Sequence, residues 1–88
     1  MELTSKKRAE LKAKAHEIDP VVQIGRYGVT LEVLAHIDKA LNDHKLIKIK
    51  FIGFKETCRE LSSEIACSTS STIIDLIGNI AILYRETQ

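Results

Sequence analysis

The feature that most constrains the fold is a stretch, residues 44–52, in which apolar and basic side chains alternate. Because successive side chains of a β-strand point to opposite faces, a period of two predicts a strand with one buried and one solvated face. The residues predicted to point inward are Ile47, Ile49 and Phe51. The residues predicted to point outward are Lys48 and Lys50. The fold therefore needs a sheet with at least one packed face.

Three other segments repeat apolar residues at helical spacing and are predicted to be helices. The first begins after a capping Thr4 and ends before Pro20. The second covers residues 31–43 and follows a capping Thr30, and the third covers residues 55–68. Their apolar positions are Leu11, Ala15 and Ile18, then Val33, Leu34, Ile37 and Leu41, then Cys58, Leu61 and Ile65.

Runs rich in β-branched residues predict three further strands, at residues 20–24, 72–77 and 80–85. The last two form a hairpin across Gly78-Asn79, and the cluster at residues 68–71 is predicted to be a loop. The order is helix, strand, helix, strand, helix, strand, strand.

This order predicts a two-layer α/β fold with a four-stranded mixed sheet. Strands joined through a helix are normally parallel, and right-handed crossovers leave both crossover helices on one face of the sheet. We expect the other face to be open. The residues predicted to lie on that open face are Lys48, Lys50, Ile73, Asp75 and Ile77.

The length of 88 residues predicts one domain over residues 1–88, and 44% hydrophobic residues are enough for a packed core. No apolar run has the ~20 residues of a membrane span, and no apolar stretch follows the N-terminal lysines. Cys58 and Cys67 would lie on opposite helix faces, too far apart to bridge. We expect a cytoplasmic protein without metal, cofactor, membrane or small-molecule substrate.

Charge is unevenly distributed along the chain. Residues 1–55 carry eleven Lys and Arg against seven Asp and Glu, a net charge of +4, whereas the remainder carries a net charge of −3. This asymmetry indicates an anionic partner for the N-terminal part of the surface, although ordinary solvated lysines explain it equally well.

A glycine loop, Gly25-Arg26-Tyr27-Gly28, lies between a predicted strand and the start of a predicted helix. Glycines allow close approach to the backbone, and a helix N-terminus attracts anions, so this geometry suits a phosphodiester. Arg26 adds a phosphate donor, and the Tyr27 ring is able to stack on an unpaired base. The alternative is that two glycines only form a strand-to-helix turn, because a single GxxG is a weak motif.

Basic residues could extend this loop into a larger binding surface. Lys6, Arg8 and Lys12 belong to a basic run on the first helix, in which Lys7 and Lys14 share a neighbouring face. Lys48 and Lys50 point the same way from one strand. A solvated helix face explains the first group, and protection of a sheet edge explains the second. Occurring with the glycine loop, they favour backbone-directed binding of nucleic acid.

Enzymatic function is not expected. The sequence has no triad spacing, catalytic carboxylate pair, Walker loop or dinucleotide-binding motif. His16, His36 and His44 are interpreted as surface or capping histidines.

Several segments together resemble the CRM domain (chloroplast RNA splicing and ribosome maturation), above all its free-standing bacterial form, the YhbY family. They are Leu3–Arg8, Ala15-His16, Pro20–Gly28, His44–Lys50 and Ile77–Arg85. The resemblance implies a fold similar to the C-terminal domain of translation initiation factor three. It also implies RNA binding through the glycine loop and the basic residues, and association with precursors of the large ribosomal subunit. Tyr27 departs from the family, which commonly has a small or polar residue there.

On this basis the chain is predicted to be a ribosome assembly factor that binds ribosomal RNA. The predicted contacts are Gly25, Arg26, Tyr27, Gly28, Lys6, Arg8, Lys12, Lys48 and Lys50. The alternative is a protein-interaction module that uses the open sheet face, where Ile73 and Ile77 would form part of an apolar patch.

Overall fold

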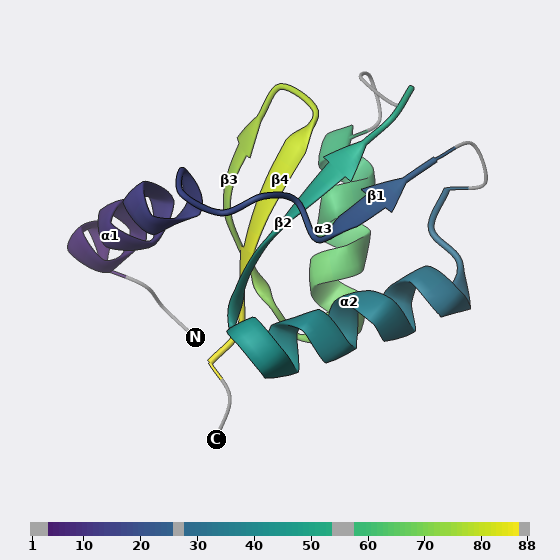
Figure 1. The fold of residues 1–88 in the computed structure, drawn as a ribbon, viewed down its shortest axis with the longest axis horizontal. Coiled ribbons are helices and arrows are strands. Elements are labelled where there is room, and N and C mark those ends of the chain that lie inside the picture. The colour runs from purple at the N-terminus through teal and green to yellow at the C-terminus, as the bar shows by residue number, and fades with distance from the viewer. Residues whose placement is uncertain (1–3, 26–27, 54–57, 87–88) are drawn as a thin grey trace.

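A computed structural model describes residues 4–25, 28–53 and 58–86, and it has the predicted order of elements (Figure 1). The helices are α1 (Ser5–Ala15), α2 (Leu31–His44) and α3 (Cys58–Thr69). The strands are β1 (Val22–Ile24), β2 (Leu46–Phe51), β3 (Thr72–Ile77) and β4 (Ile80–Tyr84). Thr4 and Thr30 cap α1 and α2 as predicted, since each side-chain oxygen accepts a hydrogen bond from a backbone N–H in the first turn.

The four strands form a mixed sheet in the order β1-β2-β4-β3. A four-stranded mixed sheet was predicted from the sequence. β1 pairs parallel with β2, while β4 pairs antiparallel with both β2 and β3. The hairpin inserts β4 between β2 and β3, so β4 is a central strand. It is therefore covered on both of its edges by hydrogen-bonded neighbours.

The larger part of the core lies between the sheet and the two crossover helices, α2 and α3. Ile37 of α2 and Ile65 of α3 pack in the same cluster as the predicted inward residues of β2, and all are fully buried. Leu34 and Leu61 are half-buried at its margin. The prediction that both crossover helices cover one face is confirmed.

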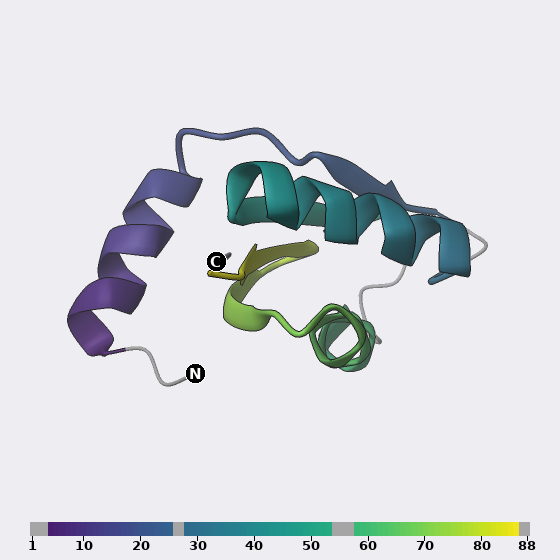
Figure 2. The ribbon, with the colours of Figure 1, turned by 90° about the horizontal axis from the view of Figure 1, so that it is seen from below.

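The expectation of an open second face is wrong, because α1 packs against it (Figures 1 and 2). Leu11 and Ala15 of α1 are buried against Ile74, Ile82 and Tyr84 of the sheet. The physical reason lies in β4, where every residue from Ala81 to Tyr84 is buried, so this strand is apolar on both faces. A strand of this kind requires cover on both sides. The apolar sheet face proposed for a protein partner is thus largely occupied by the chain itself.

Because β3 contains a β-bulge, Ile73 faces the other side of the sheet from the one predicted. The register with β4 shifts between Ile73 and Asp75, so the alternation of side chains is interrupted there. Ile73 packs in the cluster under α2 and α3, whereas Ile74 and Asp75 both contact α1. The prediction that Ile73 and Asp75 share one face of the sheet is therefore wrong, because the extra residue of the bulge interrupts the alternation between them.

The predicted C-terminal ends of two helices also differ from those in the structure. α1 ends at Ala15, so Ile18 lies beyond the helix in the connection to β1. α3 continues through Thr69, which was assigned to a loop; Thr69 is buried, and its hydroxyl donates to the Ile65 carbonyl. No disulfide joins Cys58 and Cys67; Cys58 is buried and Cys67 is exposed. Among the described residues, no helix is long and apolar enough to cross a membrane.

Candidate nucleic-acid interface

The glycine loop lies where the sequence predicted it, between the end of β1 and the start of α2. A Cβ added at Gly25 or Gly28 would meet no atom within 4 Å, so neither glycine is required by crowding inside the protein. Gly28 has a φ of +69°, a conformation that other residues rarely adopt, and its N–H donates to the Gly25 carbonyl at 2.9 Å. Arg26 and Tyr27 lie outside the described residues. The two glycines thus leave open space around the loop backbone.

A shallow hollow adjoins this loop at the N-terminus of α2. It is lined by Gly25, Gly28, Thr30, Leu31, Glu32 and Val33. Thr30 accepts from the N–H of Val33, and Glu32 places a carboxylate in the first turn, so the positive potential of this helix end is partly neutralised. Leu31 is 86% exposed, which places an apolar side chain in solvent beside the loop.

Two of the three predicted basic residues of α1 bind the sheet. The Arg8 guanidinium donates at 3.0 Å to the carbonyls of both Ile73 and Ile74, at the bulge. Lys12 forms an ion pair of 2.9 Å with Asp75, and hydrogen bonds from Lys12 and from the Leu76 N–H lower the pKa of the Asp75 carboxyl. Lys6 is exposed. Arg8 and Lys12 therefore fix α1 to β3, whatever further contacts they make.

Lys48 and Lys50 lie on the face of β2 opposite its buried residues, as predicted. In the register with β4 they stand beside Ile82 and Ile80, on the side of the sheet that α1 covers. Both are half-buried rather than fully exposed.

The predicted contacts do not form one compact cluster. Figure 1 shows the end of β1 and the start of α2, which flank the glycine loop, at the opposite end of the long axis of the molecule from α1, with β2 running between them. Lys48 and Lys50 therefore lie between the two ends. Any single partner that contacts all of these residues has to extend across the α1 face of the sheet.

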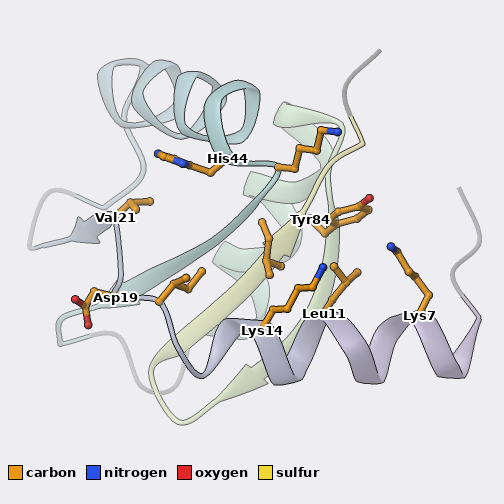
Figure 3. A pocket seen from close by; sticks show the side chains of 10 residues that line it. Lys7, Leu11, Lys14, Asp19, Val21, His44 and Tyr84 are labelled. Carbon is orange, nitrogen blue, oxygen red and sulfur yellow. The ribbon is translucent and has the colours of Figure 1, made fainter.

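A groove between α1 and the sheet was missed by the sequence interpretation, and we call it the α1 groove (Figure 3). Its volume is about 770 Å³. It is lined by Lys7, Leu11, Lys14, Ile18, Asp19, Val21, His44, Lys45, Leu46 and Tyr84. The shared helix face of Lys7 and Lys14 was a visible signal, but the contribution of Lys45 and Tyr84 depends on how α1 docks.

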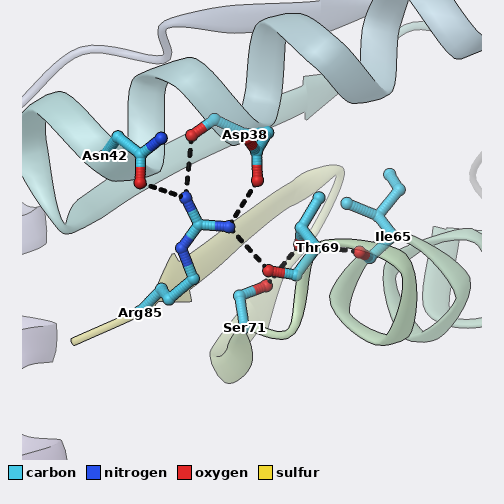
Figure 4. A network of polar contacts seen from close by, with 6 residues as sticks. All are labelled: Asp38, Asn42, Ile65, Thr69, Ser71 and Arg85. Carbon is cyan, nitrogen blue, oxygen red and sulfur yellow. Dashed lines mark hydrogen bonds and ion pairs between the residues drawn. The ribbon is translucent and has the colours of Figure 1, made fainter. Parts of the chain in front are cut away.

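Arg85, a cation at the end of β4, is engaged inside the fold (Figure 4). Its guanidinium donates to the Asp38 carboxylate at 2.6 Å and to the Thr69 carbonyl at 2.8 Å. It also donates to the Asp38 carbonyl and to the Asn42 side chain. Arg85 therefore connects α2 to the end of α3.

Among residues 4–25, 28–53 and 58–86, no group of three or more potential metal-binding side chains comes together. The arrangement instead consists of an accessible glycine backbone, half-buried lysines on a sheet face and an electropositive groove. Lysine amines and backbone N–H groups are donors of the kind that suit anionic ligands.

Comparison with known proteins places the chain among homologues. Residues 3–85 match the CRS1 / YhbY (CRM) domain. A Haemophilus influenzae protein named "RNA-binding protein" is 40% identical over 87 residues, covering 98% of this chain and 88% of that protein. A Pseudomonas aeruginosa protein named as a probable RNA-binding protein is 34% identical, covering 98% of this chain and 84% of that protein.

A solved structure has the same fold. The solution structure of a hypothetical protein of Staphylococcus aureus aligns with a TM-score of 0.83 and 32% sequence identity. The alignment covers 99% of this chain and 92% of that chain. The similarity in sequence and in structure thus extends over almost the entire length of both molecules.

Proposed function

The chain belongs to the CRS1 / YhbY (CRM) domain family, and from this premise we propose that it is a non-enzymatic RNA-binding protein. Its proposed target is ribosomal RNA in precursors of the large ribosomal subunit, and its proposed role is in assembly of that subunit in the cytoplasm. Relatives named as RNA-binding proteins support the binding activity. The ribosomal target follows from the family resemblance.

The observation that carries this proposal is the position of the glycine loop. It joins the end of β1 to the N-terminus of α2 and leaves open space beside Gly25 and Gly28. A phosphodiester can approach such a backbone closely, because no Cβ stands in the way and backbone N–H groups donate to its oxygens. In this proposal the loop residues Gly25, Arg26, Tyr27 and Gly28 contact the RNA backbone.

Basic residues on the α1 face extend the proposed interface beyond the loop. In this proposal Lys48 and Lys50 contact phosphates of an RNA that crosses this face, and Lys6, Arg8 and Lys12 contact phosphates at its far end; their positions on β2 and α1 support it. Arg8 and Lys12 would do so while still bound to β3. The net charge of only +1 favours weak affinity for naked RNA. Specificity then comes from folded RNA shape or from neighbouring ribosomal proteins.

Crosslinking in cells followed by sequencing of the attached RNA tests the target directly. The proposal expects enrichment of large-subunit ribosomal RNA, and binding in vitro that weakens steeply as salt rises. Crosslinks dominated by other RNAs would contradict the ribosomal target. Salt-insensitive binding to a protein, with no RNA recovered, would contradict RNA binding itself.

A further inference from the structure

The α1 groove combines an apolar floor with a basic rim. Its floor contains Leu11, Leu46 and the largely buried Tyr84, which is 8% exposed. Its rim contains the amines of Lys7, Lys14 and Lys45. The volume of about 770 Å³ lies within the range of about 300–1,000 Å³ that is usual for ligand sites. The floor suits a flat, weakly polar group, and the rim suits anions.

The rim of the groove is predominantly positively charged. Three lysines face one carboxylate, Asp19, which lies at the opposite end of the groove from Lys7 (Figure 3). Lys7 holds its amine 5.9 Å from the centre of the Tyr84 ring, so one cation already lies next to the aromatic part of the floor. A neutral peptide or an uncharged metabolite leaves these amines without counter-charge, whereas a nucleotide supplies phosphates for the rim and a flat base for the floor.

The backbone at the rim is also unusual. Lys45 has φ 65° and ψ −45°, a conformation that costs a non-glycine residue energy, and it directly follows α2. Strained residues of this kind gather at binding sites, where surrounding structure maintains them. Here the hydrogen bonds from the Lys45 N–H to Leu41 and from the Arg85 N–H to the Lys45 carbonyl hold the residue in place.

We propose that the α1 groove binds an unpaired nucleotide of the RNA strand, with its base on the apolar floor and its flanking phosphates on Lys7, Lys14 and Lys45. Lys7 and Lys14 are seven residues apart on α1, roughly 10 Å along the helix axis. The single phosphate of a free nucleotide cannot easily contact both amines, whereas the two phosphates that flank a nucleotide in a strand can be reached by these two long, flexible side chains. The inference rests on the proposed RNA-binding function and adds a contact far from the glycine loop.

The test uses the full chain with isotope-labelled methyl and aromatic groups, titrated in turn with pentauridine, uridine monophosphate and a duplex RNA of similar length. The expected result is that pentauridine shifts the signals of Leu11, Leu46 and Tyr84, whereas the duplex does not. Lys7→Gln combined with Lys14→Gln should weaken pentauridine binding by at least about tenfold at low salt. Lys39→Gln, an exposed lysine of α2 outside the groove, should change it less than about twofold.

A second pair of variants separates charge from shape. Val21 is 39% exposed at the groove, so Val21→Glu and Val21→Gln should both fold. Val21→Glu should weaken pentauridine binding severalfold more than Val21→Gln, because only Glu repels the phosphates.

The outcomes distinguish this inference from the proposed function. Binding of folded ribosomal RNA without any shift at the groove floor would overturn the inference alone. Equal affinity for uridine monophosphate and pentauridine would overturn the assignment to a strand. Failure of the full chain to bind any RNA would overturn the proposed function itself.

Discussion

The amine of Lys12 lies 2.9 Å from a carboxylate oxygen of Asp75, and this ion pair joins α1 to the bulged strand β3. The Lys12 hydrogen bond is the largest cause that lowers the pKa of Asp75. A carboxyl whose pKa is lower in the folded state stabilises the fold above its unfolded pKa and loses that contribution as the pH falls through the folded pKa. The pair therefore strengthens the docking of α1 at neutral pH but not in strong acid.

Replacing Lys12 by Gln should raise the pKa of Asp75 and shift acid unfolding to higher pH. The loss of stability at neutral pH should be no more than about 1 kcal/mol, because the pair is partly exposed. A carboxyl-detected NMR titration measures the pKa. Lys14→Gln, on the same helix but not paired with Asp75, is the control, and an equal shift in both variants would remove the specific role of Lys12.

Replacing Arg85 by Ala should lower the free energy of unfolding by about 2–3 kcal/mol, since a charged donor shared by several acceptors is lost. Arg59→Ala, on the exposed face of α3, should change it by less than about 0.5 kcal/mol. Urea unfolding compares the two variants. Similar values for both would show that the Arg85 network contributes little.

Ile37→Ala and Ile65→Ala should each cost about 2–5 kcal/mol, because both side chains are fully buried and their loss leaves cavities. Leu34→Ala and Leu61→Ala should cost less than these, since both are half-buried. Leu31→Ala, at a site 86% exposed, serves as the surface control. Thermal unfolding provides the ranking, and a cost below about 0.5 kcal/mol at Ile37 or Ile65 would contradict the assigned core.

Changing Lys6, Lys48 or Lys50 to Ala should reduce the magnitude of the salt slope of RNA binding by roughly 0.7–0.9 per lost phosphate contact. The Lys6 variant should be as stable as the parent, because Lys6 is exposed, whereas the half-buried Lys48 and Lys50 should each lose a little stability through lost packing of their stems. Arg8→Ala should also lower the stability by about 1 kcal/mol, through its lost bonds to β3. Fluorescence anisotropy over a salt series measures the slopes, with Lys39→Ala as control; slopes equal to that control would exclude these residues from the interface.

The element order and the two faces of β2 were predictable, because helical spacing, strand alternation and the threonine caps are local properties of the sequence. The docking of α1 was harder to predict, since its two buried residues, Leu11 and Ala15, do not indicate which sheet face receives them. The bulge at Ile73 and Ile74 is also set by tertiary contacts, including the Arg8 guanidinium.

For the candidate site, the sequence predicted the glycine loop and its position before α2. Composition alone could not distinguish cations available to a ligand from cations bound inside the fold. Lys12 pairs with Asp75, a residue 63 positions away along the chain. The α1 groove brings α1 together with residues far along the chain, such as Lys45 and Tyr84, so the shared helix face of Lys7 and Lys14 could not reveal it alone.

The most direct test of the central claim compares Gly28→Asp with Gly28→Asn in co-sedimentation with large-subunit precursors. Asp and Asn have similar shape and both tolerate the positive φ of Gly28 better than most residues, at a cost of about 1 kcal/mol. Thermal unfolding should show that both variants melt cooperatively. Only Asp places a negative charge where the phosphate is expected, so Gly28→Asp should leave the precursors while Gly28→Asn remains largely bound. If the Gly28→Asp variant co-sediments with the precursors as well as the parent does, the claim that this loop binds RNA is contradicted.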